Sequence, residues 1–266
     1  MVPVSVVIIT KNEAEIIASC IKAVRLITDD IIVVDNDSTD ETREIAHTYG
    51  CRVYRENWDG YGANKNKGIA YARYNWILSI DADEIPNETL IRALHGIKLD
   101  RPEIVYDISF RSYYGQKPIN FGSWGRDHHI RLFNRKLVKW SEPPVHETLV
   151  LPPNIIIKKL DGQLHHFSIR DTSEFLNKTM HYAKLSAAKY ALSGRSATVA
   201  KLYISPMFHF FKNYIVFLGF LDGREGWNIA MMISKHTWLK YRLLKKRAKR
   251  HYQETAGIKD NLVIEY

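Results

Sequence analysis

The stretch IIVVDNDSTDETREI, residues 31–45, places a carboxylate directly behind four apolar residues that favour β-structure. A short, continuous apolar run of this kind is typical of a strand covered on both faces of a parallel sheet. Residues 4–9 and 76–80 form two more such runs. Helical patterns lie between the runs, so we expect the first hundred residues to form right-handed βαβ units and a mostly parallel sheet.

Polar residues after the strands indicate where the helices begin. Asn12 can cap a helix that continues to about residue 25. Ser38 with Glu41 fits a capping box, which predicts a helix to about residue 49. A short strand over 51–54 and a helix over 62–73 complete the expected alternation.

The pattern changes after residue 100. Residues 103–115 and 128–140 have strand character and are joined by a loop with Gly and Pro, which favours mixed or antiparallel pairing. From about residue 172 to about residue 250 the pattern is helical. The sequence therefore predicts an α/β domain over residues 1–170 with a mixed sheet, and a helical C-terminal extension over residues 171–266.

The composition indicates an ordered globular protein, because 45% of the residues are hydrophobic and 25% are charged. Cys20 and Cys51 have no metal-binding or redox spacing, so we expect small core residues in a reducing compartment. The chain begins with a strand pattern rather than a basic leader, which predicts that it is not secreted.

The net charge of +9 comes from one segment, residues 226–250, which holds eight Lys or Arg residues and no acidic residue. Removing these eight from the 38 basic residues leaves 30, against 29 acidic residues. We expect a near-neutral body and a cationic C-terminal arm.

Acidic residues follow two of the predicted strands. Asp35 and Asp37 follow the strand at 31–34, and Asp81 and Asp83 follow the strand at 76–80. Parallel strands present their carboxyl ends at the same edge of a sheet, where open α/β sheets bind ligands. We therefore expect both acidic groups to line one crevice.

The first acidic group does not have the spacing of a calcium-binding loop. Counted from Asp35, an EF-hand loop would need Gly at residue 40 and Glu at residue 46, where the chain has Asp40 and Ala46. Ser38, Asp40 and Glu41 are explained by the start of a helix. Asp35 ends the strand itself, and we expect it to face the crevice.

The second acidic group, Asp81-Ala82-Asp83, places two hard oxygen ligands close together after a strand. Such a pair suits Mg²⁺ or Mn²⁺ bridging a diphosphate. A turn with a capping acid is the structural alternative, because the residues that follow start a new helix.

Four segments in this order, VSVVIITKNEAEII, IIVVDNDSTDET, WDGYGANKNKGIAYA and WILSIDADE, resemble the family 2 glycosyltransferases of the GT-A fold. GSWGRDHHIRLFNR, PPVHETL, GQLHHFS and FLDGREGWNIA are similar to the bacterial branch that contains lipopolysaccharide-core β-glucosyltransferases. The resemblance implies a Rossmann-like three-layer sandwich. It also implies an inverting, metal-dependent transferase that uses Mg²⁺ or Mn²⁺ and moves a sugar from a nucleotide-diphosphate donor, such as a UDP-sugar, to a glycolipid.

The resemblance assigns roles to residues of the crevice. Asp35 would contact the base or ribose, Asp81 would lie near the ribose and the metal, and Asp83 would bind the metal directly. Many members of the family have a second aspartate where this chain has Asn36, so the identity of the nucleotide base is not predicted. The remaining implied donor contacts are Thr10, Asn12, Glu13, Asp37 and Ala82.

Glu147 matches the position of the catalytic base. Inverting transfer needs a carboxylate that accepts the proton of the acceptor hydroxyl. The structural alternative is an ion pair between Glu147 and Arg131 or Arg135, and Asp127 is a rival base.

One of two adjacent histidines matches a late histidine that approaches the metal in many GT-A enzymes. Alternation along a strand sends His165 and His166 to opposite faces, and of the two we favour His165. Lys65 could neutralise the diphosphate, with a solvated helix face as the alternative. Trp124 could stack on a sugar or pack in the core.

Residues 201–221 are apolar and aromatic but are interrupted by Pro206, His209, Lys212 and Asn213, too often for a membrane-spanning helix. This segment could pack on the α/β core or lie in the headgroup region of a bilayer.

The basic segment 226–250 favours an anionic membrane surface over a nucleic acid or a merely solvated face, because the diphosphate site suits a lipid-linked acceptor. We therefore expect a peripheral protein on the cytoplasmic face of a bacterial membrane. A polyprenyl phosphate or a capsule intermediate is an alternative acceptor, and a nucleotide-sugar-binding protein with a degenerate site is the non-enzymatic alternative. The oligomeric state is not predicted.

Overall fold

The apolar runs of the first hundred residues form adjacent parallel strands, as predicted. β1 (Val4–Thr10) lies between β2 (Ile31–Asp35) and β4 (Trp76–Asp81) and is parallel to both. β3 (Arg52–Arg55) continues the parallel order beyond β2. Every residue of β1 and β2 is buried, which explains why their sequences are apolar without alternation.

The second half of the sheet is antiparallel, so the sheet as a whole is mixed. β8 pairs antiparallel with β4, and the strand order is β3-β2-β1-β4-β8-β6-β11-β5. A separate antiparallel pair is formed by β9 and β10. The bounds of these strands are β5 (Glu84–Pro86), β6 (Ile104–Tyr114), β8 (His128–Asn134), β9 (Lys139–Trp140), β10 (Leu149–Val150) and β11 (Ile156–Ile169).

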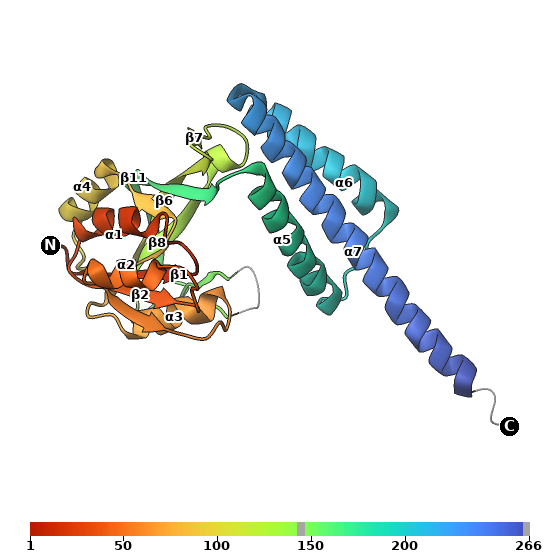
Figure 1. Ribbon diagram of the computed structural model, residues 1–266, viewed down its shortest axis with the longest axis horizontal. Helices are drawn as coiled ribbons and strands as arrows, with labels where there is room; N and C mark the ends of the chain where they lie inside the picture. Colours follow the sequence, from red (N-terminus) through yellow and green to blue (C-terminus); the bar gives the residue numbers. More distant parts are fainter. Residues whose placement is uncertain (143–146, 263–266) are drawn as a thin grey trace. The chain divides into compact units, whose positions relative to one another are not determined.

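Helices cover both faces of the sheet (Figure 1). Apolar residues of α1 (Ile17–Arg25), α2 (Thr42–Thr48) and α4 (Glu88–Gly96) share one core cluster with alternate residues of β1. On the other face, α3 (Tyr61–Ala70) packs Ile69 into a second cluster. The result is the expected three-layer α/β arrangement.

The computed structural model describes residues 1–142 and 147–262. The chain divides into a first unit, residues 1–113 and 124–168, and a second unit, residues 114–123 and the chain from residue 169 onward. The α/β domain was expected to end at residue 170, two residues later. Residues 114–123 were expected in that domain and belong instead to the second unit.

The second unit is helical from residue 172, as predicted. α7 (Arg224–Leu262) packs against both α5 (Thr172–Leu192) and α6 (Val199–Phe211). A π-helical turn (Lys212–Val216) and a 3₁₀ turn (Gly219–Asp222) connect α6 to α7. Within the described part of the chain, no helix is both long and apolar enough to cross a bilayer.

The loop at residues 114–123, which includes the short strand β7 (Lys117–Pro118), is bound to these helices. Lys117 Nζ lies 2.6 Å from Glu225 Oε2. The backbone N–H groups of Asn120 and Phe121 donate to the carboxylate of Asp222. These contacts explain why the loop belongs to the second unit.

The predicted helix caps at Asn12 and at Ser38 with Glu41 are wrong. α1 begins five residues after Asn12, and the residues directly before α1 and α2 make no side-chain cap bond, although Asp40 Oδ1 accepts the N–H of Thr42 at the start of α2. Instead, Asn12 Oδ1 accepts the N–H of Thr39 at 2.7 Å, and Ser38 Oγ accepts the N–H of Asn12 at 2.9 Å. Because β1 and β2 are parallel neighbours, the loops after them lie together, and these side chains satisfy the loop backbone.

Asp30, directly before β2, is a buried carboxylate that connects distant parts of the sheet. It accepts hydrogen bonds from Ser5 Oγ, from the N–H of Arg73 and from the guanidinium of Arg52. Burial alone would raise the pKa of Asp30, but these hydrogen bonds hold it below its ordinary value.

Both cysteines are buried and free, as the sequence predicts for small core residues. Burial raises the pKa of the Cys51 thiol to about 11 and raises that of Cys20 as well. Neither thiol therefore has the thiolate character of a reactive cysteine.

Candidate active site

Acidic residues from two strands meet at the carboxyl edge of the parallel sheet, as predicted. Asp35 ends β2 and Asp81 ends β4, with β1 between them. In the register, Thr10 pairs with Asp35 and Ile9 pairs with Asp81. The sheet topology therefore brings together residues that lie 46 positions apart in the chain.

Unsatisfied polar atoms gather at the β1–β2 part of this edge. Thr10 Oγ1, Asp35 Oδ2 and Asn36 Oδ1 are buried and have no hydrogen-bond partner among the residues that the structure describes. The other oxygen of Asp35 accepts the N–H of Ser38 at 3.1 Å and lies 3.7 Å from Arg43 Nε. Buried polar atoms are rarely left unpaired, so this edge has the character of a ligand site.

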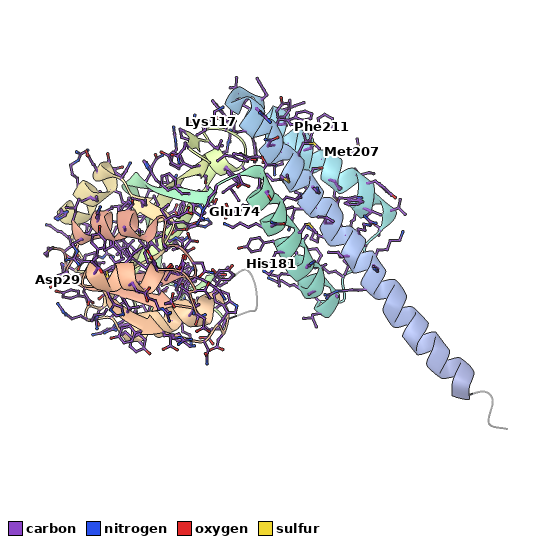
Figure 2. All side chains as sticks on the ribbon, viewed as in Figure 1. Asp29, Lys117, Glu174, His181, Met207 and Phe211 are labelled. Atoms are coloured by element: carbon purple, nitrogen blue, oxygen red, sulfur yellow. The ribbon has the colours of Figure 1, made fainter. Side chains whose placement is uncertain are left out.

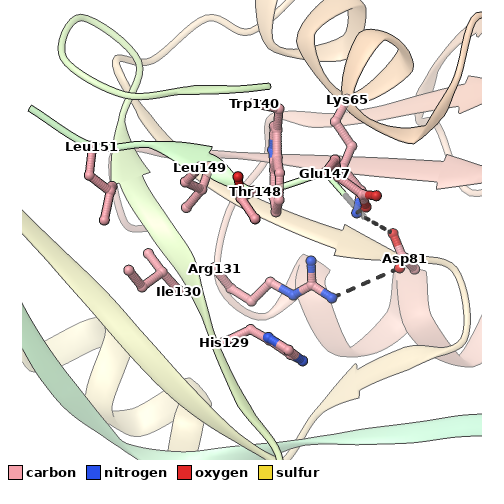
Figure 3. A pocket seen from close by; sticks show the side chains of 10 residues that line it. All are labelled: Lys65, Asp81, His129, Ile130, Arg131, Trp140, Glu147, Thr148, Leu149 and Leu151. Carbon is pink, nitrogen blue, oxygen red and sulfur yellow. Dashed lines mark hydrogen bonds and ion pairs between the residues drawn. The ribbon is translucent and has the colours of Figure 1, made fainter. Parts of the chain in front are cut away.

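The centre of the candidate site is a buried lysine between two carboxylates (Figure 3). Lys65 Nζ lies 3.1 Å from Glu147 Oε1 and 3.4 Å from Asp81 Oδ1, and 4.5 Å from the ring centroid of Trp140. Lys65 is only 2% exposed, so the alternative of a solvated helix face is wrong.

A second buried cation, Arg131 of β8, lies on the other side of Asp81. Its guanidinium is 3.9 Å from Asp81 Oδ2 and also hydrogen-bonds the buried Glu84. Burial would raise the pKa of Asp81, but Lys65 and then Arg131 and His166 hold it below its ordinary value. Asp81 is therefore a carboxylate held in its ionised form by cations on two sides.

Two glycines of α3 allow Lys65 to reach this position. A Cβ on Gly68 would lie 2.4 Å from Val7 Cγ1, and a Cβ on Gly62 would lie 1.9 Å from the carbonyl oxygen of Ser141. The missing side chains let α3 pack closely on β1 and on the residue after β9. The segment between the two glycines carries Lys65 into the buried site.

A cavity of about 390 Å³ opens beside this charge network. Lys65, Asp81, Arg131, Trp140 and Glu147 contribute to its lining, and the other lining residues are His129, Ile130, Thr148, Leu149 and Leu151. A volume of this size, apolar walls and a few convergent polar groups are typical of a small-molecule site.

Glu147 borders the cavity and pairs with Lys65, not with Arg131 or Arg135 as in the structural alternative. Arg135 instead donates to the backbone carbonyls of Ile69, in the last turn of α3, and Ala72, just after it. The rival base, Asp127, lies 3.0 Å from His129 Nε2 and is not among the lining residues of the cavity.

The two adjacent histidines of β11 lie in different surroundings. His166 Nε2 is 3.5 Å from Asp83 Oδ2, whereas His165 Nδ1 lies 3.5 Å from the hydroxyl of Tyr113. The structure therefore places His166 beside Asp83, and not His165, which the sequence analysis favoured. Burial would lower the pKa of His166, but Asp83 and the neighbouring carboxylates raise it to about 9.

Asp83 and His166 offer a divalent cation a carboxylate and, once the cation displaces the imidazole proton, a ring nitrogen. No group of three or more His, Cys, Asp or Glu side chains suited to a metal is found in residues 1–142 and 147–262. Two protein ligands are sufficient where a bound diphosphate and water complete the coordination, as is usual for Mg²⁺. The residues present therefore fit a cation that binds together with a diphosphate.

The other predicted donor contacts are more dispersed. Asp37 is half exposed and pairs with Arg55 Nε at 2.8 Å, and the side chain of Ala82 belongs to the apolar core. The N–H of Glu13 donates to Thr42 Oγ1 in the loop network that includes Asn12. Trp124 begins a 3₁₀ turn (Trp124–Arg126) and is half-buried.

Sequence reasoning did not assign Arg131 and Trp140 to the site. Arg131 occupies a buried position in β8, where a charged residue among apolar neighbours is the signal that could have identified it. Trp140 ends β9 and carries no motif, so only its packing over Lys65 shows its role.

A mixed α/β sheet with carboxylates at the carboxyl ends of its parallel strands has a ligand site at the edge where such sheets bind ligands, and comparison with known families gives its class. The family model described as "Glycosyl transferase family 2" matches residues 5–150, so the chain belongs to this family. The resemblance found in the sequence is thereby confirmed.

Individual related proteins are also glycosyltransferases. The chain is 30% identical to an uncharacterized glycosyltransferase of Rickettsia prowazekii, over 85% of this chain and 81% of the relative. It is 28% identical to the lipopolysaccharide core biosynthesis glycosyltransferase LpsC of Rhizobium meliloti, over 80% of each. Among solved structures, glucosyl-3-phosphoglycerate synthase from Mycobacterium tuberculosis matches with a TM-score of 0.35 and 27% identity, over 42% of this chain and 44% of that one.

Proposed function

We propose that the chain is an inverting transferase that moves a sugar from a UDP-sugar or a related nucleotide-diphosphate donor to a membrane glycolipid in lipopolysaccharide core biosynthesis. The observation that carries the proposal is the position of Glu147. Its carboxylate borders the same cavity as Asp81 at the carboxyl edge of the sheet, and Lys65 joins the two. The similarity to LpsC supports the class of acceptor.

In this proposal Glu147 accepts the proton of the acceptor hydroxyl as that oxygen attacks the anomeric carbon of the donor sugar. The hydrogen bond from Lys65 Nζ holds Oε1 of Glu147 and leaves the second oxygen of the carboxylate for the hydroxyl. Trp140 packs over Lys65, which is buried. The base thus has a fixed orientation before substrate binds.

The donor would bind along the edge formed by Thr10, Asp35 and Asp81. The unsatisfied Thr10 Oγ1 and Asp35 Oδ2 would take hydrogen bonds from the nucleoside. Asp83 and His166 would hold Mg²⁺ or Mn²⁺. A divalent cation held there would stabilise the charge of the departing diphosphate.

A membrane acceptor places the protein at the cytoplasmic face of a bacterial membrane, where nucleotide sugars are available. The basic segment 226–250 would attract the anionic lipids of that face. A polyprenyl phosphate or a capsule intermediate is the alternative acceptor for the same donor site.

A panel of UDP- and GDP-sugars tests the proposal, with transfer or slow hydrolysis measured with and without Mg²⁺ or Mn²⁺. We expect metal-dependent turnover of one donor. Donor binding without turnover of any donor would favour a nucleotide-sugar-binding protein instead.

A further inference from the structure

The second unit carries an apolar face on α6 and the turn that follows it. Six large side chains on one side of this segment are between 50% and 64% exposed: Tyr203, Ile204, Met207, Phe208, Phe211 and Ile215. Their spacing places them on one helical face, and Met207 and Phe211 can be followed on α6 in Figure 2. We define these six residues as the apolar face.

The opposite side of the same segment faces the interior of the unit. Leu202, Pro206, Asn213 and Gly219 are buried there. Asn213 Nδ2 donates to the carbonyl of His209, and its Oδ1 accepts the N–H of Ser123. The interior of the unit thus takes only part of the apolar surface of this segment, while the six residues of the apolar face are exposed.

The exposed face continues past α6. Val216, Phe220 and Leu221 are 66%, 45% and 54% exposed, and Trp227 at the start of α7 is 46% exposed. Single exposed apolar residues are ordinary, but a contiguous surface of this extent marks an interaction site. Phe, Tyr and Trp together on such a surface are typical of proteins that lie in the membrane interface.

The segment around the apolar face has no unpaired acidic side chain. Residues 199–231 contain two acidic residues, and both have hydrogen-bond or ion-pair partners. Asp222 is buried and accepts two backbone N–H groups, and Glu225 pairs with Lys117 at 2.6 Å. Lys201 and Arg224 are exposed at the two ends of the segment.

We propose that the apolar face of α6 inserts into the headgroup region of a bilayer that contains anionic phospholipid. The cations at both ends of the segment complement the anionic headgroups, whereas a second copy of the chain would bring like charges together. Hydrophobic insertion makes part of the binding independent of salt, unlike attraction by the basic segment alone.

Vesicle flotation of the full chain tests this proposal. The proposal rests on the proposed function only in assuming that the acceptor is located in a membrane. Flotation needs neither donor nor metal, so its result is separate from that of the transfer assay. Phosphatidylcholine vesicles with and without phosphatidylglycerol are compared at low salt and at about 1 M salt, where the Debye length is about 3 Å. We expect binding to the anionic vesicles that persists in part at high salt.

The double variant Phe208→Glu/Phe211→Glu should reduce the high-salt binding at least about tenfold, because two aromatic groups that would be buried in the bilayer are lost and two negative charges are added. Leu192→Glu is the matched control, since Leu192 is 88% exposed in the same unit but lies at the end of α5. It should bind as the unaltered chain does. The milder pair Phe208→Ser/Phe211→Ser, which adds no charge, should give an intermediate loss.

The proposal is overturned if the unaltered chain leaves the vesicles completely at high salt, or if the double Glu variant, folded by circular dichroism, binds like the control. It is also overturned if sedimentation in lipid-free solution shows a dimer that Phe208→Glu/Phe211→Glu dissociates. In that case a second copy of the chain covers the apolar face.

Discussion

The substitution Glu147→Gln removes the proposed general base and keeps its shape. Glu147 Oε1 accepts a hydrogen bond from Lys65 Nζ at 3.1 Å, and the glutamine carbonyl oxygen can accept the same bond. The side chain of Glu147 is 16% exposed, so the change is confined to a nearly closed part of the site. The substitution removes the negative charge, and with it the ability to take a proton, but keeps the size and the hydrogen bond of the side chain.

General-base catalysis contributes about 10²–10⁴-fold to a rate, which corresponds to about 2.7–5.5 kcal/mol of transition-state stabilisation. We expect kcat to fall by this factor, because no other carboxylate that lines the described cavity is free to replace Glu147. Asp81 lies between Lys65 and Arg131. The affinity for the donor should change little, since the donor edge at Asp35 is not altered.

Single-turnover kinetics and donor titration, with the donor identified by the panel, measure the two effects separately. Glu142→Gln is the matched control, because Glu142 lies five residues before Glu147 and is exposed. Its side chain accepts a hydrogen bond from Asn66 Nδ2. Asp127→Asn tests the rival base and should retain most of the rate. If Glu147→Gln retains turnover within about threefold of the unaltered enzyme, Glu147 is not the base.

Three further predictions concern the charges that build the site and the sheet. Lys65→Met should lower the free energy of unfolding by about 1.5–3 kcal/mol, measured by urea denaturation, because Glu147 loses a buried charged hydrogen-bond partner and Asp81 loses a buried cation 3.4 Å away. In a double-mutant cycle with Glu147→Gln the two effects should not add, and additive effects would refute the coupling. Asp30→Asn should lower the free energy of unfolding by a similar amount at pH 7. Because the folded pKa of Asp30 lies below its ordinary value, its contribution to stability is present above about pH 4 and is lost as the pH falls through the folded pKa. Urea denaturation of the variant and of the unaltered chain should therefore give converging stabilities in acid, and a constant difference would refute the role of the charge. His166→Ala should weaken the binding of Mn²⁺ about tenfold or more, measured by calorimetry in the presence of a nucleoside diphosphate, whereas His165→Ala should leave the affinity near normal. The reverse result would make His165 the ligand.

The sequence was sufficient for the elements whose identity depends on local pattern. The apolar runs at 4–9, 31–34 and 76–80 could only be buried strands, and the topology rules for parallel strands then placed Asp35 and Asp81 at one edge. The residues that begin the helices could not be predicted as well from the sequence. Asn12 and Ser38 have the chemistry of caps, but each found a partner in the neighbouring loop, which no local pattern reveals.

The candidate site shows the same division. Motif order and the family resemblance pointed to Asp81, Asp83 and Glu147, each a carboxylate at a recognisable position. The sequence could not show that Lys65 is buried between Asp81 and Glu147, because a lysine on a helix is most often solvated.

Periodicity and charge along the chain were therefore enough to predict the α/β order, the acidic edge and the cationic C-terminal segment. They were not enough to predict which of two adjacent histidines lies beside Asp83 or which side of α6 is exposed. Alternation fixes that neighbouring side chains point to opposite faces, but not what covers each face. That depends on contacts between residues far apart in the chain, and these form only when the elements pack.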